Sequence, residues 1–525
     1  MRRSLISALI ATLVAGQSID AQFIDQTLAP RGYLRLQAHP HSTSWDSRYA
    51  RLADGTIGEQ PLGLDLTDPT ALTLFPGIST LSSLVGDLLG APGYTPVLGS
   101  SEGRIRQEVT QVDLGGHFGV QDWLTIGVIV PWARGRTTVD ALFSPDTVNG
   151  DLGLNPRLAN RTGVDAFIAS TGTASAAAQG YAATICGAGP GGACTSAQGL
   201  ADRARGFEAF STGAYEASPF FPRSGSSTAD AILLTAAALH ADLLAAGLVG
   251  LPLPMLLATE WLMPADFPLL PGVAGAGIEA TPLQSRKGLW SVGDVEVSAL
   301  VRLIDNLTPD PEKKRPHFGY RFIGGLIVRL PTGLPEDPNV LFDIGIGDGQ
   351  TDKEGRLIGS LTLGERLGLD AGIRYGIQDA TVVVKRVAPV ALVLAPIETL
   401  QEVTWKPGSY LAIDIRPALR LSDELALTGE YRFFRKGSDA FGLVDASSGL
   451  DPTLLDMASR LKAHQIGGGI RYQTVDRWLA GETTRPLEFH LRVLRTVHGS
   501  GGATPATTRV EAGIRLFKRV WGPRY

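Results

Sequence analysis

Two groups of residues have the types needed for nucleophilic catalysis, but neither has the required setting. Residues 99–103 (Gly-Ser-Ser-Glu-Gly) match the nucleophile-elbow pattern Gly-x-Ser-x-Gly. An elbow needs a strand before the serine and a helix after it, whereas here a loop rich in proline and glycine precedes Ser101 and a strand pattern follows it. His490 and Ser500 could form a lipase dyad, yet nothing in the sequence positions a third group to orient the histidine. We therefore predict that the chain is not an enzyme.

Residues that could bind a metal or a nucleotide form equally incomplete sets. The stretch Asp343–Asp352 has acidic residues that suggest a calcium loop, but without the rest of the loop spacing ordinary turn chemistry is the preferred interpretation. His39 and His41 could share a metal, although two ligands alone are a weak set, and a bend in the chain is preferred. Gly187–Gly192 matches Gly-x-Gly-x-x-Gly without a preceding βαβ unit, which indicates a flexible loop. We expect no cofactor and no metal.

The two cysteines, Cys186 and Cys194, lie close together in a segment rich in glycine and alanine. A metal site would need more ligands, and the nearest histidine in the sequence, His240, is far away. In an oxidising compartment such a pair joins as a disulfide. We predict a Cys186–Cys194 disulfide that closes a small loop.

A larger set of charged residues shares one pattern, because each member alternates with apolar residues along a segment of about ten residues. If the apolar positions face lipid, the charged positions face the inside of a barrel. Mixed charge at this density could line an aqueous path or bind polar groups of a ligand, or it could form ion-pair ladders that fill a narrow barrel. The predicted lumen-lining residues are Glu296, Arg302, Arg321, Arg329, Asp370, Arg374, Asp414, Arg416, Glu430, Arg432, Arg471, Glu488, His490 and Arg492.

The elements that must position these residues are β-strands. In residues 367–378, apolar residues alternate with Gly, Asp, Arg and Gln, so one face suits hydrocarbon and the other is polar. Repetition of this pattern predicts an all-β fold, a transmembrane outer-membrane β-barrel of about 12 antiparallel strands. Fourteen strands are possible if residues 381–402 or the long insertion contain a further pair. The predicted strands are 32–51, 104–118, 124–139, 292–304, 318–331, 351–363, 367–379, 408–421, 425–436, 463–474, 486–498 and 506–517.

The lengths of the connections predict the topology of this barrel. Short turns alternate with long loops, and outer-membrane barrels have short periplasmic turns and long external loops, so both termini are expected in the periplasm. Tryptophan rings favour the two membrane interfaces. We expect Trp123, Trp478 and Trp521 at the periplasmic end, and Trp132, Trp290 and Trp405 toward the opposite end.

Two places in the pattern need a local distortion. Residues 33–51 are interpreted as one strand that bends around His39–His41, because a thirteenth strand would break the parity of the topology. Pro417 interrupts an otherwise regular strand, and proline removes a ladder hydrogen bond. We expect either a bulge at Pro417 or a strand placed elsewhere.

Two external segments lack the alternation, the loop 52–103 and the Ala/Gly-rich insertion 145–290. Within the insertion, residues 231–248 predict a helix. We prefer a loop helix over the barrel mouth to a transmembrane helix, because His240 and Asp242 would lie at its centre. Residues 66–96 predict a second apolar, partly helical loop. These loops could plug the lumen, cap its mouth or receive hydrophobic molecules, and packing of the loops against one another is an equal alternative.

The N-terminus predicts the destination of the chain. Residues 1–21 combine a basic start, a short apolar run and a small-residue cleavage site, which is typical of a signal peptide. Residues 22–525 then form a single barrel domain in the outer membrane of a Gram-negative-type bacterium, in contact with outer-membrane lipid and assembled by the barrel-assembly machinery. The formal net charge of -5 argues against a nucleic-acid partner. The oligomeric state is not determined by the sequence.

Several segments together resemble a known family. Leu326–Gly333, the stretch Asp343–Asp352, Gly372–Tyr375 and Gly293–Arg302 resemble segments of the outer-membrane transporters named for the meta-pathway of phenol degradation. These transporters are similar to the channel superfamily for long-chain fatty acids and aromatic hydrocarbons. The insertion 145–290 is not part of this pattern, and the roughly ten residues between the signal peptide and the first strand are too short for the lumen hatch of the fatty-acid channels. Any plug is therefore expected to come from the external loops.

The resemblance implies passage of small hydrophobic molecules. The leading hypothesis is an outer-membrane channel for passive uptake of small hydrophobic or aromatic compounds. The alternative is a structural or adhesion barrel without transport, and the third is an outer-membrane hydrolase.

Overall fold

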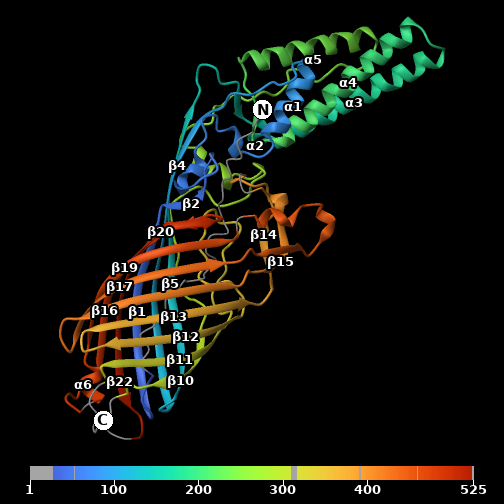
Figure 1. Cartoon of the computed structure of the whole chain (residues 1–525). Helices are drawn as coiled ribbons and strands as arrows, with labels where there is room; N and C mark the ends of the chain where they lie inside the picture. Colours follow the sequence, from blue (N-terminus) through green and yellow to red (C-terminus); the bar gives the residue numbers. More distant parts are fainter. Residues whose placement is uncertain are drawn as a thin grey trace.

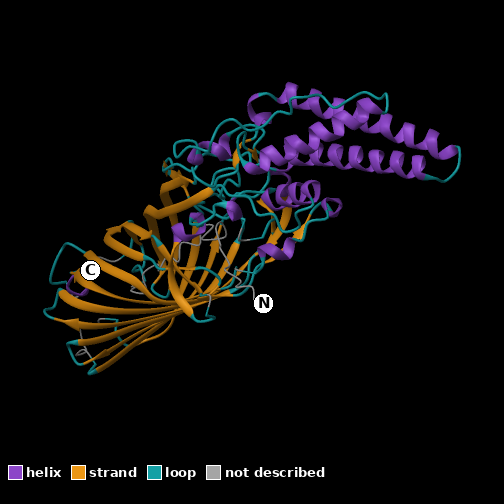
Figure 2. Cartoon of the chain, turned by 90° about the horizontal axis from the view of Figure 1, so that it is seen from above, coloured by secondary structure: helices purple, strands orange, loops and turns teal. Residues whose placement is uncertain are grey.

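Twelve antiparallel strands close into a barrel in the computed structural model (Figures 1 and 2). The structure describes residues 28–52, 54–308, 316–389, 392–457, 459–479 and 481–522, so the predicted signal peptide 1–21 lies outside the described residues. Each strand pairs with its neighbours along the sheet, and β5 pairs with β10 to close the ring. The barrel strands are β1 (Tyr33–Trp45), β4 (Gly99–Gln121), β5 (Leu124–Pro145), β10 (Glu296–Asp305), β11 (Phe318–Arg329), β12 (Asp352–Leu363), β13 (Leu367–Gln378), β16 (Tyr410–Arg420), β17 (Leu425–Lys436), β19 (Leu461–Gln473), β20 (Leu487–Gly501) and β22 (Thr508–Arg519).

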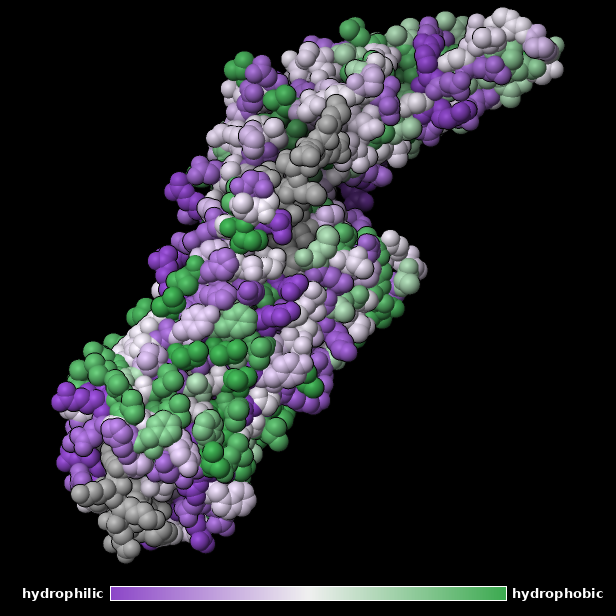
Figure 3. Space-filling view, viewed as in Figure 1, coloured by the Kyte–Doolittle hydropathy of each residue, from purple (hydrophilic) through white to green (hydrophobic). Residues whose placement is uncertain are grey.

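The sequence prediction of the barrel is confirmed strand by strand. The alternation places apolar side chains on the outside, as in β13, where Ile373 is 47% exposed and its neighbour Arg374 is 5% exposed. Hydrophobic side chains gather on the barrel wall in Figure 3, between more hydrophilic surfaces nearer the two ends. A closed barrel with an apolar outer wall and charged inner residues is the architecture that satisfies all backbone hydrogen bonds in lipid. The barrel therefore spans a membrane.

The possible thirteenth and fourteenth strands exist, but they lie outside the ring. In the region 381–402, β14 (Thr381–Arg386) pairs with β15 (Leu400–Lys406), and β15 pairs with β18 (Ala440–Leu443) in a separate three-stranded sheet. In the insertion, the two-residue strands β8 (Arg286–Lys287) and β9 (Ser291–Val292) pair with the upper part of β5. The hydrogen-bonded ring thus keeps twelve members.

The expected bend at His39–His41 is wrong. Strand β1 runs through Pro40 without interruption and pairs with β4 at each of these positions. The break comes instead at Asp46, after which β2 (Ser47–Arg51) leaves the barrel to pair with β3 (Ile57–Pro61) and β21 (Thr504–Pro505).

The expected bulge or misplaced strand at Pro417 is also wrong. Strand β16 lies where it was predicted, and its register with β17 is the same before and after Pro417. The ring of Pro417 points outward, and Gly429 on β17 has no side chain to clash with it; a Cβ built there would lie 3.3 Å from Pro417 Cγ. Pro417 therefore removes a hydrogen bond between the strands but does not change the register of β16.

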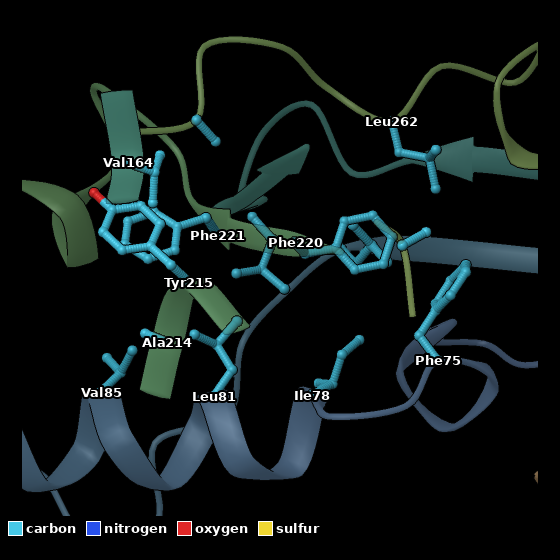
Figure 4. Close-up of a cluster of buried hydrophobic side chains, with 14 of the residues drawn as sticks. Phe75, Ile78, Leu81, Val85, Val164, Ala214, Tyr215, Phe220, Phe221 and Leu262 are labelled. Atoms are coloured by element: carbon cyan, nitrogen blue, oxygen red, sulfur yellow. The ribbon is translucent and has the colours of Figure 1, made fainter. Parts of the chain in front are cut away.

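The external segments pack into one apolar domain above the barrel, so the alternative of loops that pack against one another is realised. Its helices are α1 (Ile78–Leu89), α2 (Pro156–Ala159), α3 (Arg161–Gly187), α4 (Gly192–Ala217) and α5 (Ser227–Ala245). Side chains from α1, α4 and the short strand β7 (Phe220–Pro222), which pairs with β6 (Leu152–Leu154), meet in its core (Figure 4). Tyr215 and Phe221 stack there with ring centroids 4.2 Å apart.

Helix α5 confirms the predicted loop helix, although its place differs from the expected one. It packs with α1 and α4 in a helical arm that extends away from the barrel axis (Figure 1). By length and composition alone, α5 is apolar enough to cross a membrane. The antiparallel helices α3 and α4, which the sequence pattern did not reveal, form the rest of this arm.

The Cys186–Cys194 disulfide is confirmed and joins α3 to α4 at the tip of the arm. Because the closed loop is short, we expect Cys186→Ser/Cys194→Ser to destabilise the arm by about 2–3 kcal/mol and to leave the barrel unchanged. Hydrogen exchange of α3 and α4, compared with exchange of the barrel strands, would measure this. Equal protection of the arm in both proteins would contradict the prediction.

The tryptophans only partly follow the expected belts. Trp123, Trp132, Trp290 and Trp521 are exposed, as membrane-interface residues should be. Trp478 lies at the expected end, in the connection between β19 and β20, but Trp478 and Trp405 are both buried and do not face lipid. Trp405 packs on Phe441 in the external sheet, and Trp478 lies in the short helix α6 (Val475–Leu479) against inward-facing residues of β1 and β22.

Candidate functional site

The inside of the barrel carries a continuous charged ladder and a smaller strip of apolar side chains. The charged side is a ladder of ion pairs that crosses β13, β16, β17, β20 and β22. Asp414 Oδ2 lies 3.3 Å from Arg374 Nη2, and Asp414 Oδ1 lies 2.6 Å from Arg432 Nε. Glu430 continues the ladder, with Oε1 2.9 Å from Arg432 Nη2 and Oε2 3.0 Å from Arg492 Nη1.

The ladder ends on β22 and is supported by neighbours. Arg492 pairs with Glu511, whose Oε2 lies 3.1 Å from Arg509 Nη2 and whose Oε1 lies 3.3 Å from His490 Nε2. Such pairs satisfy charges that would otherwise be costly to bury. The result is a rigid polar wall in which each guanidinium meets at least one carboxylate.

All fourteen sequence-predicted lumen residues lie on the inner face of the barrel strands, where they are buried or half-buried. The structure divides them among three levels. Glu296 and Arg329 pair at the external end; Arg374, Asp414, Arg416, Glu430, Arg432, His490 and Arg492 belong to the ladder; and Arg302, Arg321, Asp370, Arg471 and Glu488 pair nearer the periplasmic end.

Sequence reasoning missed several partners of these residues. Five of these partners each form an ion pair with a predicted lumen residue. They are Asp305, Asp352, Glu354, Glu511 and Arg515. Most of them alternate with apolar residues inside predicted strands, so the same pattern would have found them. Tyr410 was harder to find, because an aromatic ring can face either side of a strand; its hydroxyl donates to Glu354 Oε2 at 2.6 Å.

The opposite side of the lumen carries an apolar strip. It follows the inner faces of β5, β10, β11 and β12, and its side chains are at most 3% exposed. Charged residues of the same strands flank the strip, because Glu296 is directly opposite Ile129 and Glu354 is directly opposite Ile327. The strip consists of Ile129, Leu300, Ile323, Ile327 and Ile358.

The loop between β11 and β12, residues 330–351, which we call the inward loop, lies against the part of β5 beyond the strip. Thr137 Oγ1 on β5 donates to Phe342 O at 2.9 Å, and Ile344 is seated over Gly135, where a built Cβ would lie only 3.1 Å from Ile344 Cβ. Phe342 and Ile344 are buried. The inward loop therefore occupies the mouth of the lumen.

Carboxylates tie the inward loop to the rim of the barrel. Asp294 accepts backbone hydrogen bonds from Gly333 and Asp348, and Asp348 accepts one from Gln378 Nε2 at 3.0 Å. Burial raises the pKa of Asp348 to about 8, and the carboxylates of Asp352 and Asp294 add to this rise. Burial also raises the pKa of Asp294.

This arrangement predicts that the inward loop is held less tightly as the pH rises. Because the raised pKa of Asp348 favours the protonated carboxyl in the closed loop, the stabilisation is full below the ordinary carboxyl pKa of about 4 and is lost as the pH rises to about 8. Hydrogen exchange of residues 340–346, corrected for its intrinsic pH dependence, should show less protection at pH above about 8 than at about 5. Asp348→Asn should remove this difference, and an unchanged slope in the variant would contradict the assignment.

The periplasmic end of the lumen is occupied as well. Leu28 packs inside the barrel against Leu300, Ile323 and Ile358, and Ala29 O accepts a hydrogen bond from Thr125 Oγ1 at 3.5 Å. Helix α6 adds Trp478, whose ring lies 5.0 Å from that of Tyr33. The expectation that only external loops could obstruct the lumen is therefore corrected, because the residues before β1 reach inside it.

The residues considered for catalysis and metal binding are not brought together. His490 and Ser500 lie on the same strand ten positions apart, which corresponds to roughly 33 Å along an extended chain. Ser101 lies at the start of β4 with no helix after it. In the portion of the chain that the structure describes, no group of three or more His, Cys, Asp and Glu residues is arranged to hold a metal ion.

The charged side of the lumen contains a cavity. It has a volume of at most 360 Å³ and lies near the periplasmic end. Its lining includes Arg416, Thr428, Glu488, His490 and Arg492.

Comparisons with known proteins show only distant likeness. No family model and no curated protein sequence matches the chain. Among solved structures, an outer membrane channel from Pseudomonas putida F1 aligns over 94% of this chain and 98% of its own, with 8% identity and a TM-score of 0.42. The toluene transporter TodX of Pseudomonas putida aligns over 94% and 90%, with 10% identity and a TM-score of 0.25. A FadL homologue of Pseudomonas aeruginosa aligns over 93% and 90%, with 8% identity and a TM-score of 0.26. Such distant likeness assigns the chain to no family.

Proposed function

We propose that this chain is an outer-membrane channel for passive uptake of small hydrophobic or aromatic compounds. The observation that carries the proposal is the apolar strip, which lies on the inner faces of β5, β10, β11 and β12 and meets Leu28 at its periplasmic end. A barrel whose lumen is filled by ion pairs alone would not require an apolar strip. A solute that moves along it gains dispersion contacts and avoids the charged wall.

In the proposed channel, a group of apolar residues closes each end of the lumen. Phe342 and Ile344 are buried in the inward loop on the external side, and Leu28 packs on the strip at the periplasmic end. Both covers are apolar, so a hydrophobic solute can replace their contacts when they move, whereas an ion cannot. Uptake in this scheme needs no energy source other than the concentration gradient.

The remaining parts of the proposal concern export and membership. We infer that residues 1–21 are a cleaved signal peptide and that residues 22–525 form one barrel domain, folded into the outer membrane of a Gram-negative-type bacterium by the barrel-assembly machinery. The external loop 52–103 and the insertion 145–290 belong to that domain. The resemblance of Leu326–Gly333 and Asp343–Asp352 supports membership of the transporter family named for phenol degradation.

The strip can be tested by flux measurements with a matched control. Ile323→Asn places an unpaired amide on the strip at a cost of about 1–3 kcal/mol, and we expect it to slow uptake of an aromatic fluorophore into proteoliposomes by about tenfold. Thr428→Asn places the same amide on the charged side and should leave uptake within about twofold. Heat-modifiable gel mobility would confirm that both barrels are folded. Wild-type flux equal to that of protein-free liposomes would refute the channel.

A structural barrel without transport is the second candidate, and the ion-pair ladder favours it. Buried ion pairs from five strands line the lumen, and side chains that fill a barrel leave no room for a solute. In that case the helical arm would be the functional part. Absence of flux in the wild type, together with absence of flux after release of the inward loop, would select this candidate.

A further inference from the structure

A cluster of cationic side chains lies on the outer wall of the barrel at its external end. Arg435 on β17 and Lys462 on β19 are directly opposite each other, and Arg495 on β20 pairs in register with Ile466 of β19. These residues alternate with buried ones, so their side chains point outward. His464 and His498, also opposite each other, lie between these levels with ring centroids 5.7 Å apart. We call these five residues the outer basic patch.

The charges of the outer basic patch are not neutralised by the described residues. No carboxylate in the described part of the chain forms an ion pair with Arg435, Lys462 or Arg495. Glu59 on β3 is opposite Tyr49, and the ring of Tyr49 lies 6.0 Å from that of His498. Other outward cations form ion pairs with carboxylates of the chain.

Two outward cations elsewhere on the external half of the barrel provide the contrast. Lys353 Nζ lies 2.7 Å from Asp379 Oδ2, and Arg104 Nη2 lies 3.1 Å from Glu102 Oε1. At these two positions the chain supplies its own counter-ion. At the outer basic patch, by contrast, the permanent charges of Arg435, Lys462 and Arg495 have no counter-ion among the described residues, so an external anion can bind them.

The surface directly below the patch is apolar. Ile466, Ile470 and Val493 are 54%, 41% and 48% exposed on β19 and β20. Tyr431 lies at the boundary and its hydroxyl is 2.8 Å from His464 Nδ1, and Lys462 Nζ lies 5.8 Å from the centre of the Phe433 ring. Aromatic residues at the edge of an apolar band mark the membrane interface. The patch is therefore at the level of lipid headgroups.

We propose that the outer basic patch binds the phosphate of a phosphorylated lipid in the outer leaflet, whose acyl chains lie along the apolar wall below. Charge complementarity and continuity with the apolar wall together select this ligand. Guanidinium and ammonium groups are strong phosphate donors, and the imidazoles of His464 and His498 can add hydrogen bonds. A soluble anion would use the charges alone, whereas a lipid phosphate uses both the charges and the wall. The inference does not depend on the proposed transport.

Binding to the full-length protein in detergent tests the proposal, with native mass spectrometry as the readout. The probe is lipid A with its phosphates, and the comparison is dephosphorylated lipid A. Because each surface cation contributes about 1 kcal/mol to binding of anionic lipid, Arg435→Gln/Lys462→Gln/Arg495→Gln should raise the dissociation constant about 100-fold. The control Arg104→Gln/Lys353→Gln removes two paired cations and should change it less than about threefold.

Comparison of lipid A with dephosphorylated lipid A and with inorganic phosphate tests whether the patch recognises a lipid phosphate. Dephosphorylated lipid A should bind the wild type as weakly as lipid A binds the triple variant. Equal binding of lipid A to the triple variant, or equal binding of the two lipids to the wild type, would overturn the proposal. Competition by millimolar inorganic phosphate would show an anion site without lipid selectivity and would also overturn it. If the triple variant does not fold, Arg435→Gln and Arg495→Gln should each show an intermediate loss of about fivefold.

Discussion

Glu430→Gln is expected to lower the free energy of unfolding of the barrel by about 3–5 kcal/mol. The carboxylate of Glu430 is shared by Arg416, Arg432 and Arg492. Arg432 keeps Asp414 and Arg492 keeps Glu511, but Arg416 loses the single carboxylate that pairs with it among the described residues. A buried guanidinium without a carboxylate is far more costly than the loss of a surface pair.

Urea unfolding of the protein in detergent micelles or liposomes, followed by tryptophan fluorescence, would measure this loss. Lys353→Gln is the matched control, because it breaks the exposed pair with Asp379 and should cost less than about 1 kcal/mol. A loss below about 1 kcal/mol for Glu430→Gln would mean that water already solvates the ladder. The lumen would then be wetter than the buried positions of these residues indicate.

Release of the inward loop is expected to give the largest change in flux. Phe342→Asn/Ile344→Asn removes two buried side chains of this loop, of which Ile344 lies over Gly135. Burial of two such side chains stabilises the closed loop by about 3–6 kcal/mol. If wild-type uptake is limited by the fraction of open molecules, the double variant should take up an aromatic probe about 100-fold faster. Asparagine is chosen because Phe342 has a positive φ of 60°, which asparagine tolerates better than most residues.

Leu334→Asn is the control for this experiment. Leu334 belongs to the same loop but is 63% exposed, so its replacement should leave the rate within about twofold. A rate increase of the same size in both variants would place the barrier elsewhere. Unchanged uptake in the double variant would indicate that the residues around Leu28, not the inward loop, limit passage.

The barrel could be predicted from the sequence because its signal is local. A strand exposes alternate side chains to opposite faces, so residues 367–378 show their inside and outside by themselves. The same reasoning placed β16 despite Pro417. The helices α3 and α4 were missed although their buried positions, such as Val164, Phe167, Ala174 and Ala178, recur at helical spacing. Many of the buried positions are alanines, whose hydropathy differs little from that of the exposed small residues, so the helical repeat was not recognised in the sequence.

The sequence by itself therefore determined the twelve strands, the inner and outer faces of each strand, the disulfide and the charged character of the lumen. Only the tertiary structure decided which charges meet, because ladder partners such as Glu430 and Arg492 lie on strands that are not neighbours in the ring. It also decided that apolar side chains of the lumen gather in one strip, that Leu28 packs on this strip and that Phe342 lies against β5. These features depend on contacts between segments far apart in the chain, which alternation within one strand cannot encode.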